Sequence, residues 1–311
     1  MRITTIIPCY NVALYIRRAV ESVWAQTHDD VELICVDDGS TDDTVTILKE
    51  LHGERPDRLQ LIMQTNKGAC AARNAGMSAA TGEYIQFLDA DDELLPEKLA
   101  HQAALAAKTG MPDLVIGSSR TFSADGGSVR KVVQSTRDRD PWLDLMAHRM
   151  NVTSTLLWRT AAVREAHGWN EELRSSQEYD LMFRMLKNGA RVVYDDAVLT
   201  YIHQRKSGSI GQTNVKTNWE RFIALRAAIL QHVRDHQLTA NERPYLQVLF
   251  DSIRTLYPYD RKAALEFHQR LIPADFVPTT SLATGNGYLL LHRLLGFDLA
   301  NRLRTMLGGR G

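Results

Sequence analysis

Three aspartates stand close together in the segment Asp89-Ala90-Asp91-Asp92. Asp89 and Asp91 are two residues apart, so their side chains point to the same side if a preceding strand continues through them. Carboxylate oxygens are hard ligands that suit Mg²⁺ or Mn²⁺, and these ions commonly bridge a protein carboxylate to substrate phosphates. The spacing therefore predicts a metal and diphosphate site. The alternative is that one carboxylate only caps a helix that begins near Glu93.

Polar residues also follow three other short apolar runs in the N-terminal third of the chain. Because the carboxyl ends of parallel strands meet at one edge of a sheet, these clusters would line a single pocket with several carboxylates, an arginine and a lysine. Gathering charges in one pocket costs desolvation free energy, so a role in packing alone does not explain why these residues are there. The clusters are Pro8-Cys9-Tyr10-Asn11, Asp37-Asp38, and Asn66-Lys67-Gly68 with Arg73-Asn74 just after it.

Short apolar runs alternate with segments of helical spacing over the same third, and this order predicts the elements that position the clusters. Strand and helix in strict succession are typical of a parallel sheet covered on both faces, so the fold class is α/β. Ser40 or Thr41 is expected to cap the second helix. The predicted strands are 3–7, 31–36, 59–63 and 84–88, and the predicted helices are 12–26, 41–51 and 69–80.

The remaining sequence is less regular and becomes helical toward its end. We expect Trp142 and Trp158 to belong to the core. The predicted elements are a strand at 113–118, a turn at 125–127, helices at 141–150, 159–167 and 177–188, a strand at 192–201, helices from 214 onward, a loop at 273–287 and a last helix at 288–307.

Composition excludes several classes of function. The formal net charge of +0 and the sparse aromatic residues argue against a nucleic-acid partner. The N-terminus lacks the pattern of a signal peptide, and no stretch approaches the roughly 18 apolar residues that a membrane span needs. Cys9, Cys35 and Cys70 form no C-x-x-C pair, which fits a reducing compartment. A cytoplasmic location is therefore expected.

Four segments, taken in order, resemble glycosyltransferase family 2. The resemblance covers residues 1–210 and implies the GT-A fold, a Rossmann-like and mainly parallel sheet flanked by helices, with a helical C-terminal extension. It implies a catalytic domain over 1–212, divided into a nucleotide-binding half (1–92) and an acceptor half (93–212), and a helical region over 213–311. The segments are Ile-Ile-Pro-Cys-Tyr-Asn at 6–11, Val-Asp-Asp-Gly-Ser-Thr-Asp at 36–42, Asn-Lys-Gly with Ala-Arg-Asn-Ala-Gly within 66–76, and Gly-Glu-Tyr-Ile-Gln-Phe-Leu-Asp-Ala-Asp-Asp at 82–92.

The resemblance also implies an activity and a set of donor-binding residues. The activity is inverting transfer of a hexosyl or N-acetylhexosaminyl group from a nucleoside-diphosphate sugar, with a uridine nucleotide favoured, onto a saccharide or lipid-linked acceptor. Pro8, Tyr10 and Asp38 would line the base and ribose pocket with Asp37 beside them, and Asp89 and Asp91, joined by Asp92, would hold the metal and diphosphate. The predicted nucleotide-sugar site comprises Pro8, Tyr10, Asn11, Asp37, Asp38, Asn66, Lys67, Gly68, Arg73, Asp89, Ala90 and Arg205.

An acidic element at 176–181 is the predicted source of the catalytic base. Inversion in one displacement requires a group that takes the proton of the attacking hydroxyl. The segment Gln177-Glu178-Tyr179-Asp180-Leu181, followed by Arg184, looks like the family's Glu-Asp-x-x-Leu-x-x-Arg, but departs from it because Gln-Glu replaces Glu-Asp. By register Glu178 is the base and Asp180 is the competitor. Either acid could instead only stabilise a helix N-terminus, and Arg184 could form an i,i+4 salt bridge with Asp180.

Two further regions carry open alternatives. His203 follows the strand at 192–201 and is a candidate Mn²⁺ ligand, while Arg205, Lys206 and Ser209 could contact phosphate. Trp169 could stack on an acceptor sugar or belong to the core. The last helix is rich in leucine and arginine, so it could lie on the inner face of a membrane as a peripheral contact or serve as a docking or dimer helix of a homo-oligomer.

The biological setting implied by the resemblance is bacterial surface polysaccharide or glycolipid synthesis. A nucleotidyltransferase is disfavoured, because it would place a glycine-rich loop with an arginine after the first strand, where this chain has Pro-Cys-Tyr-Asn. A non-catalytic scaffold that binds a nucleotide-sugar is the second alternative. The departure at Gln177-Glu178 supports it, and the intact Asp89-Ala90-Asp91 opposes it.

Overall fold

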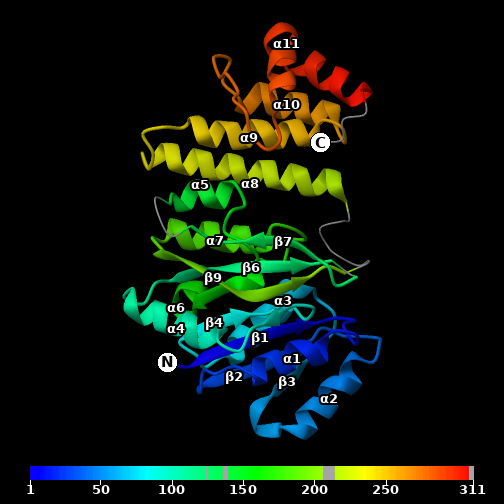
Figure 1. The fold of residues 1–311 in the computed structure, drawn as a ribbon, viewed down its shortest axis with the longest axis vertical. Helices are drawn as coiled ribbons and strands as arrows, with labels where there is room; N and C mark the ends of the chain where they lie inside the picture. Colours follow the sequence, from blue (N-terminus) through cyan, green and yellow to red (C-terminus); the bar gives the residue numbers. More distant parts are fainter. Residues whose placement is uncertain (124, 136–138, 206–213, 308–311) are drawn as a thin grey trace. The chain divides into compact units, whose positions relative to one another are not determined.

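The computed structural model describes residues 1–123, 125–135, 139–205 and 214–307 (Figure 1). The chain divides into two compact units, one of residues 1–141 and 148–208 and one of residues 142–147 and 209–311. The predicted domain boundary between residues 212 and 213 lies outside the described residues. We describe each unit in turn.

The first half of the first unit is a parallel sheet. Its strands are β1 (Ile3–Cys9), β2 (Val31–Asp37), β3 (Gln60–Met63) and β4 (Tyr84–Phe87), and they lie in the order β3-β2-β1-β4. Every pair among them is parallel, and Cys9 and Met63 both lie opposite Asp37. The predicted strands and their parallel arrangement are therefore confirmed, and the polar clusters that follow β1, β2 and β3 meet at one edge.

Helices cover both faces of this half. Ile3 and Ile7 of β1 share a buried cluster with residues of α1 (Ile16–Trp24), α2 (Thr44–Glu54) and α4 (Lys98–Lys108). On the opposite face, α3 (Ala69–Ala79) approaches so closely that a Cβ on its Gly76 would lie 2.5 Å from a methyl group of Ile6. A short 3₁₀ turn, Pro56–Arg58, precedes β3. The alternation along β1 is what allows one strand to serve two helical layers.

The expected cap of α2 is wrong. The helix begins at Thr44, and the carboxylate of Asp42 accepts a 3.0 Å hydrogen bond from the Thr44 backbone N–H. Ser40 instead accepts from the backbone N–H of Asn11, and Thr41 donates its backbone N–H to the Asn11 side chain. The two hydroxyl residues thus join the loops after β1 and β2. They make this tertiary contact instead of capping α2.

The second half of the sheet is mixed, and its order is β4-β8-β6-β9-β5. Strand β8 (Leu156–Arg159) runs antiparallel to β4 and to β6 (Leu114–Phe122), whereas β9 (Val192–His203) is parallel to β6. The short β5 (Glu93–Leu94) pairs antiparallel with β9, and β7 (Ser128–Val132) pairs antiparallel with β6. Because β5 occupies Glu93, no helix begins there, and the alternative that an aspartate of 89–92 caps such a helix is wrong.

Short helices complete this half. They are α6 (Thr160–Glu165), α7 (Gln177–Lys187) and a 3₁₀ turn at Thr153–Thr155. The predicted helix at 159–167 begins too early, since β8 takes the residues up to Arg159. Trp158 is fully buried in β8, as expected for a core residue, while Trp142 is only half-buried.

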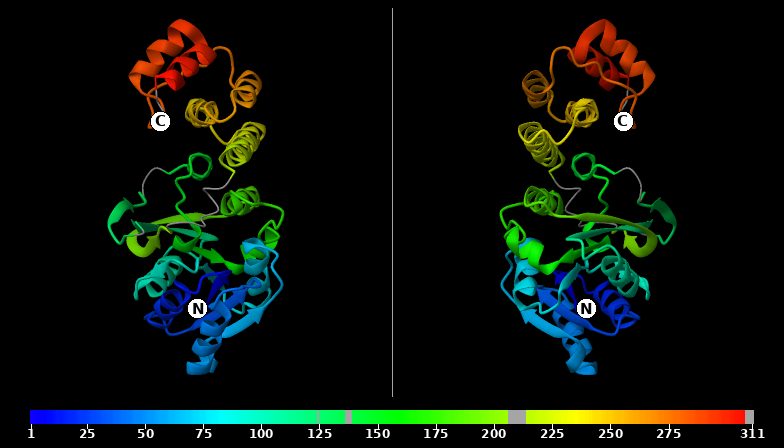
Figure 2. Two further views of the ribbon diagram at one scale, coloured as in Figure 1. Left: turned by 90° about the vertical axis from the view of Figure 1, so that its right-hand side faces the viewer. Right: turned by 90° about the vertical axis from the view of Figure 1, so that its left-hand side faces the viewer.

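The second unit is helical (Figure 2). Its elements are α5 (Pro141–Met146), whose residues 142–146 belong to this unit, α8 (Val215–Asp235), α9 (Arg243–Leu256), α10 (Arg261–Leu271) and α11 (Asn286–Met306). Helix α5 ends four residues before the predicted 150. Gly296, with φ +73°, kinks α11. None of the described helices is both long enough and apolar enough to cross a membrane.

Candidate active site

Asp38 fixes the loop that follows β3. One carboxylate oxygen accepts from the Gln64 side chain at 2.7 Å and from the backbone N–H of Lys67 at 2.8 Å. The other accepts from the backbone N–H of Gly68 at 2.8 Å. Asp38 is buried, so this ring of donors offsets the cost of desolvating its charge. The predicted pocket residue therefore also shapes its neighbours on loop 66–68.

Asp37 keeps one acceptor atom without a partner. Its Oδ2 accepts from the backbone N–H groups of Gly39 and Ser40 at 3.1 and 3.2 Å, and its buried Oδ1 has no hydrogen-bond partner among the residues that the structure describes. A buried carboxylate oxygen left unpaired costs free energy that a ligand donor would recover. Gly39 has φ +73°, and a Cβ there would lie 2.9 Å from the Asn66 nitrogen. The two loops can approach this closely only because residue 39 is glycine.

The loop after β1 presents an exposed ring. Asn11, at φ +51°, accepts from the Thr41 backbone N–H at 2.8 Å and is thereby tied to the loop after β2. Tyr10 beside it is 48% exposed, and Pro8 lies inside β1. The ring of Tyr10 is thus available to a flat ligand, such as a nucleobase, at the carboxyl end of the sheet.

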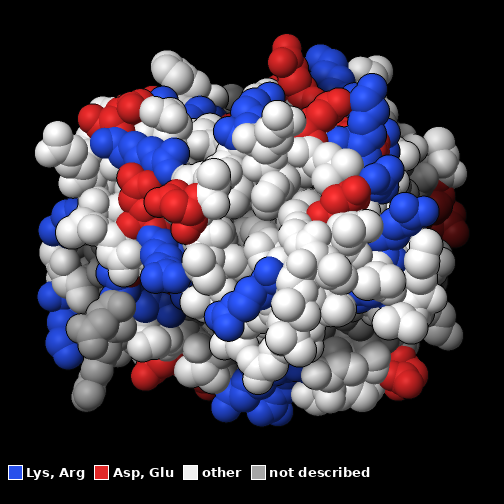
Figure 3. All heavy atoms as spheres, turned by 90° about the horizontal axis from the view of Figure 1, so that it is seen from above, with Lys and Arg blue, Asp and Glu red and all other residues white. Residues whose placement is uncertain are grey.

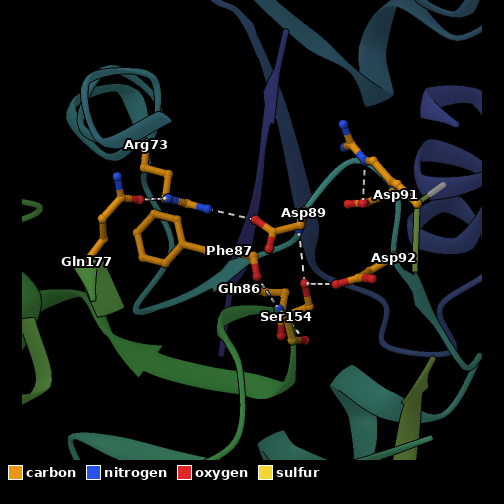
Figure 4. Close-up of polar contacts among 9 residues, drawn as sticks. Arg73, Gln86, Phe87, Asp89, Asp91, Asp92, Ser154 and Gln177 are labelled. Atoms are coloured by element: carbon orange, nitrogen blue, oxygen red, sulfur yellow. Dashed lines mark hydrogen bonds and ion pairs between the residues drawn. The ribbon is translucent and has the colours of Figure 1, made fainter. Parts of the chain in front are cut away.

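Arg73 connects two parts of the site (Figure 4). Its guanidinium forms a 2.7 Å ion pair with Asp89 and a 3.2 Å hydrogen bond to the side-chain oxygen of Gln177, at the start of α7. The same group lies 4.5 Å from the ring of Trp169. Trp169 is buried against Phe87, with ring centroids 5.1 Å apart, so it packs in the core and supports Arg73.

The turn at 89–92 is organised by Ser154 (Figure 4). The Ser154 hydroxyl accepts from the Asp89 backbone N–H at 3.1 Å and donates to Asp92 at 2.5 Å. The other oxygen of Asp92 accepts from the His203 backbone N–H at 3.1 Å. Burial, and then the charges of Asp89 and Asp91, raise the pKa of Asp92 well above its ordinary value. Asp92 therefore holds the turn together, which leaves Asp89 and Asp91 as its outward carboxylates.

Asp91 forms an ion pair with Arg205. Its carboxylate lies 2.5 Å from Nε of Arg205, whose guanidinium lies 5.1 Å from the ring of Tyr15. The Asp91 backbone carbonyl accepts from Arg18 at 2.7 Å. The predicted phosphate-binding Arg205 thus lies beside the diphosphate motif, while Lys206 and Ser209 lie outside the described residues.

The His203 ring lies against Glu93. Its Nε2 is 3.5 Å from a Glu93 oxygen, too far for a good hydrogen bond, and the ring stacks on Phe122 at 5.4 Å. Burial, followed by the charge of Arg18, lowers the pKa of His203. A neutral imidazole can ligate a metal, and the charge of Asp91 acts on this ring and opposes the lowering of its pKa.

The carboxylates of the turn at 89–92 fit a metal ion that is also coordinated by a bound ligand. Among the described residues, no group of three or more His, Cys, Asp or Glu side chains could hold a metal ion. Asp89 and Asp91 each give one oxygen to an arginine and supply hard oxygen ligands within one turn. Such a pair suits Mg²⁺ or Mn²⁺ whose remaining ligands come from phosphates and water.

Glu178 and Asp180 differ in their surroundings. Arg184 holds Asp180 through two hydrogen bonds of 3.0 and 2.7 Å and also donates to the Ala166 carbonyl. Glu178 is half-buried in the first turn of α7, and no ion pair engages it in the described part of the chain. Burial raises the pKa of Glu178, Arg73 opposes this shift, and Asp89 adds to it. The arrangement favours Glu178 as a base and gives Asp180 the salt bridge.

A family model decides which proteins this chain belongs with. The model described as glycosyl transferase family 2 matches residues 4–168, which is more than half of the chain. The chain belongs to glycosyl transferase family 2.

Two curated relatives illustrate the range of the family. The uncharacterized glycosyltransferase alr2836 of Nostoc sp. is 50% identical over 32% of this chain and 31% of its own length. The succinoglycan biosynthesis protein ExoO of Rhizobium meliloti is 30% identical over 74% of this chain and 68% of its own length. The chain spans only about a third to two fifths of the length of several relatives that it matches.

Solved structures share the fold. Staphylococcus aureus TarS 1-349 in complex with UDP-GlcNAc matches with a TM-score of 0.68 and 21% identity, over 99% of this chain and 92% of that one. The mannosyltransferase PcManGT of Pyrobaculum calidifontis, in complex with GDP-Man and Mn²⁺, has a TM-score of 0.54 and 18% identity, over 98% and 87% of the two chains. The predicted GT-A fold with C-terminal helices is confirmed, although its sheet is parallel only in the first half and mixed in the second.

The family motifs place the remaining predicted residues near this edge of the sheet. Lys67 and Gly68 contact Asp38 through their backbones, and Asn66 lies against Gly39. Gly68 has φ +96° and directly precedes α3, and Ala90 is buried inside the turn at 89–92.

Sequence reasoning missed a buried polar chain beneath the acidic turn. Lys98 donates to the side-chain oxygen of Gln86, so the Gln86 amide nitrogen faces the carbonyls of Phe87 at 2.7 Å and Ser154 at 2.9 Å. Lys98 and Gln86 are fully buried. The sequence feature that could have indicated these buried polar contacts is a glutamine within the apolar strand predicted at 84–88. No local sequence pattern indicated Ser154 or Lys98.

The buried ammonium of Lys98 should make stability depend on pH. Burial lowers the Lys98 pKa to about 7 in the fold, so the unfolded chain binds this proton more tightly between about pH 7 and pH 10. The free energy of unfolding should therefore rise over this range, relative to that of Lys98→Met, by up to about 1.4 kcal/mol per pH unit. Urea unfolding at pH 7 and pH 9 measures it.

Lys108→Met is the matched control, because Lys108 is an exposed residue of the same helix. It should leave the pH dependence of stability unchanged. Equal pH dependence in the wild type and in Lys98→Met would show that Lys98 titrates as it does in water.

Proposed function

We propose that this chain transfers a sugar from a nucleoside-diphosphate sugar, with a uridine nucleotide favoured, onto an acceptor hydroxyl with inversion. The observation that carries the proposal is the position of Arg73, which joins Asp89 of the turn at 89–92 to Gln177 at the start of α7. A donor-side acidic turn and an acceptor-side base thus belong to one site. Membership of glycosyl transferase family 2 supports the reaction class.

On the donor side, Tyr10 and the unpaired Oδ1 of Asp37 would receive the base and ribose. Asp89 and Asp91 would hold Mn²⁺ or Mg²⁺ together with the diphosphate. When bound, the cation neutralises charge on the departing diphosphate. Arg205 adds a second positive group beside Asp91, and Arg73 keeps Asp89 in place. The complex of PcManGT with GDP-Man and Mn²⁺ supports this assignment.

On the acceptor side, Glu178 would take the proton of the attacking hydroxyl. Its raised pKa makes its carboxylate a stronger base than an exposed glutamate, while the charge of Arg73 opposes that rise. Gln177 meets Arg73 through a neutral amide oxygen, so the departure from Glu-Asp leaves the charge of Arg73 to Asp89 and Glu178. This contact gives Gln177 a place in the proposed site and supports transfer over the alternative of a non-catalytic scaffold.

The acceptor we propose is a saccharide or lipid-linked saccharide of a bacterial surface polymer, with a hexosyl or N-acetylhexosaminyl group transferred. The relative ExoO, named for succinoglycan biosynthesis, and the UDP-GlcNAc complex of TarS support this assignment.

A donor screen tests the proposal. UDP-, GDP- and dTDP-sugars are each titrated by calorimetry with and without Mn²⁺, and slow donor hydrolysis is followed in parallel. We expect one nucleotide to bind in a metal-dependent way. If the folded protein binds none of the donors in the presence of metal, the proposed transfer is wrong.

A further inference from the structure

Helix α11 exposes a repeated pattern of large apolar residues. Each half of the kinked helix carries Leu-x-x-Arg-Leu, first as Leu290–Arg293–Leu294 and then as Leu299–Arg302–Leu303. Residues at i, i+3 and i+4 share one helix face. The four leucines are 60%, 70%, 48% and 38% exposed, and Met306 and Leu307 extend the second set at 68% and 83%. Exposure of several large apolar residues on one element marks an interaction surface.

The opposite face of α11 is anchored within the second unit. Tyr288 lies under the guanidinium of Arg254 at 4.0 Å, and Asn301 donates to the Tyr288 hydroxyl at 2.8 Å. Phe297 packs against Phe250, with ring centroids 5.7 Å apart. The helix therefore has its own packing contacts, and the leucines are not needed for them.

The charges on α11 indicate which kind of partner its exposed leucines would contact. Arg293 and Arg302 are exposed, and the acid of the helix, Asp298, is held by Arg261 at 2.6 Å and by the Tyr257 hydroxyl at 2.5 Å. Figure 3 shows uncharged surface with both Lys and Arg and Asp and Glu side chains around it at this end of the chain. Positive charge around exposed apolar residues suits a surface that combines acyl chains with anionic headgroups.

A second copy of the chain suits this face less well. A two-fold contact sets a patch against itself, so one interface would gather the arginines of α11 from both copies. The acid of the helix that could compensate is Asp298, which Arg261 already holds. Like charges brought together at an interface cost free energy, whereas anionic lipid would be attracted.

We propose that the leucine face of α11, namely Leu290, Leu294, Leu299 and Leu303 with Arg293 and Arg302, lies on the surface of a membrane that contains anionic lipid. The contact is peripheral, because no described helix can cross a membrane. It goes beyond the proposed transfer and does not depend on it. It would hold the chain where lipid-linked molecules are found.

Vesicle sedimentation of the full chain tests the proposal. Phosphatidylcholine vesicles with and without phosphatidylglycerol are compared at low and high salt. We expect binding to the anionic vesicles alone, weakening as salt screens the arginines. Leu290→Ser with Leu294→Ser, and separately Leu299→Ser with Leu303→Ser, should each weaken binding by about tenfold or more. Arg293→Gln should weaken it by about fivefold.

Leu14→Ser is the matched control, because Leu14 is 89% exposed but lies in the first unit. It should bind vesicles as the wild type does, and circular dichroism shows that each variant is folded. Failure of the wild type to bind anionic vesicles overturns the proposal. So does unchanged binding by both leucine variants, or a wild-type dimer that these variants convert to monomers without any effect on vesicles.

Discussion

Glu178→Gln should lower kcat by a factor on the order of 10²–10⁴, because the acceptor hydroxyl then loses its proposed base. Glutamine keeps the shape of the side chain at the start of α7, so the affinity for the donor should change little. In the wild type, kcat should rise with pH as Glu178 loses its proton. The raised pKa of Glu178 places this rise above the pH at which an exposed glutamate titrates. Initial rates across pH, with donor and acceptor saturating, measure both effects.

Two further variants separate this base from its competitor. Asp180→Asn breaks the ion pair with Arg184 and should lower the free energy of unfolding by less than about 1 kcal/mol, with kcat within about fivefold of the wild type. Glu165→Gln, at an exposed position of α6, should change neither quantity. If Asp180→Asn abolishes turnover while Glu178→Gln retains it, Asp180 is the base.

Asp91→Asn should lower kcat/KM by a factor on the order of 10³, since the loss of a carboxylate from the proposed metal site removes several kcal/mol of charge stabilisation. The donor should still bind through its nucleoside, but Mn²⁺ should no longer strengthen that binding. Chelation with EDTA should abolish turnover by the wild type and have little further effect on the variant. Donor titrations with and without Mn²⁺, together with steady-state rates, provide the measurement.

Asp196→Asn is the control, because Asp196 is an exposed aspartate on β9 in the same unit. It should leave the metal dependence of donor binding unchanged. Unaltered Mn²⁺ dependence in Asp91→Asn would remove Asp91 from the proposed metal site, and Asp89→Asn would then test the other outward carboxylate.

The sequence predicted those parts of the fold that depend on short-range patterns. The strands β1 to β4 are apolar runs ended by polar residues, and the i,i+4 spacing of Asp180 and Arg184 was enough to indicate their ion pair. Strand β8 was missed because Leu156–Arg159 is brief and a helix follows it at once. The lining of an α/β edge can thus be listed from sequence, whereas short antiparallel insertions cannot.

The supports of the site depend on contacts between distant residues. Ser154 lies more than sixty positions from the turn that it organises, and Lys98 connects to that turn through Gln86 and then Ser154. The expected cap at Ser40 or Thr41 failed for a similar reason, since both residues contact Asn11 from the neighbouring loop. Propensity describes what a residue can do locally, and tertiary contacts decide which of these options is used.

The hydrogen bonds that Asp38 accepts from loop 66–68 make the backbone conformation of the loop independent of one of its side chains. Asp38 accepts from the backbone N–H groups of Lys67 and Gly68, and a backbone N–H remains whatever side chain position 67 carries. Position 68 is restricted by its φ of +96°, which favours glycine, and position 38 by its buried acceptors. The side chain at position 67 has no such restriction. In evolution it can therefore be replaced, which changes the groups that the loop presents to a ligand while the backbone of the loop keeps its conformation.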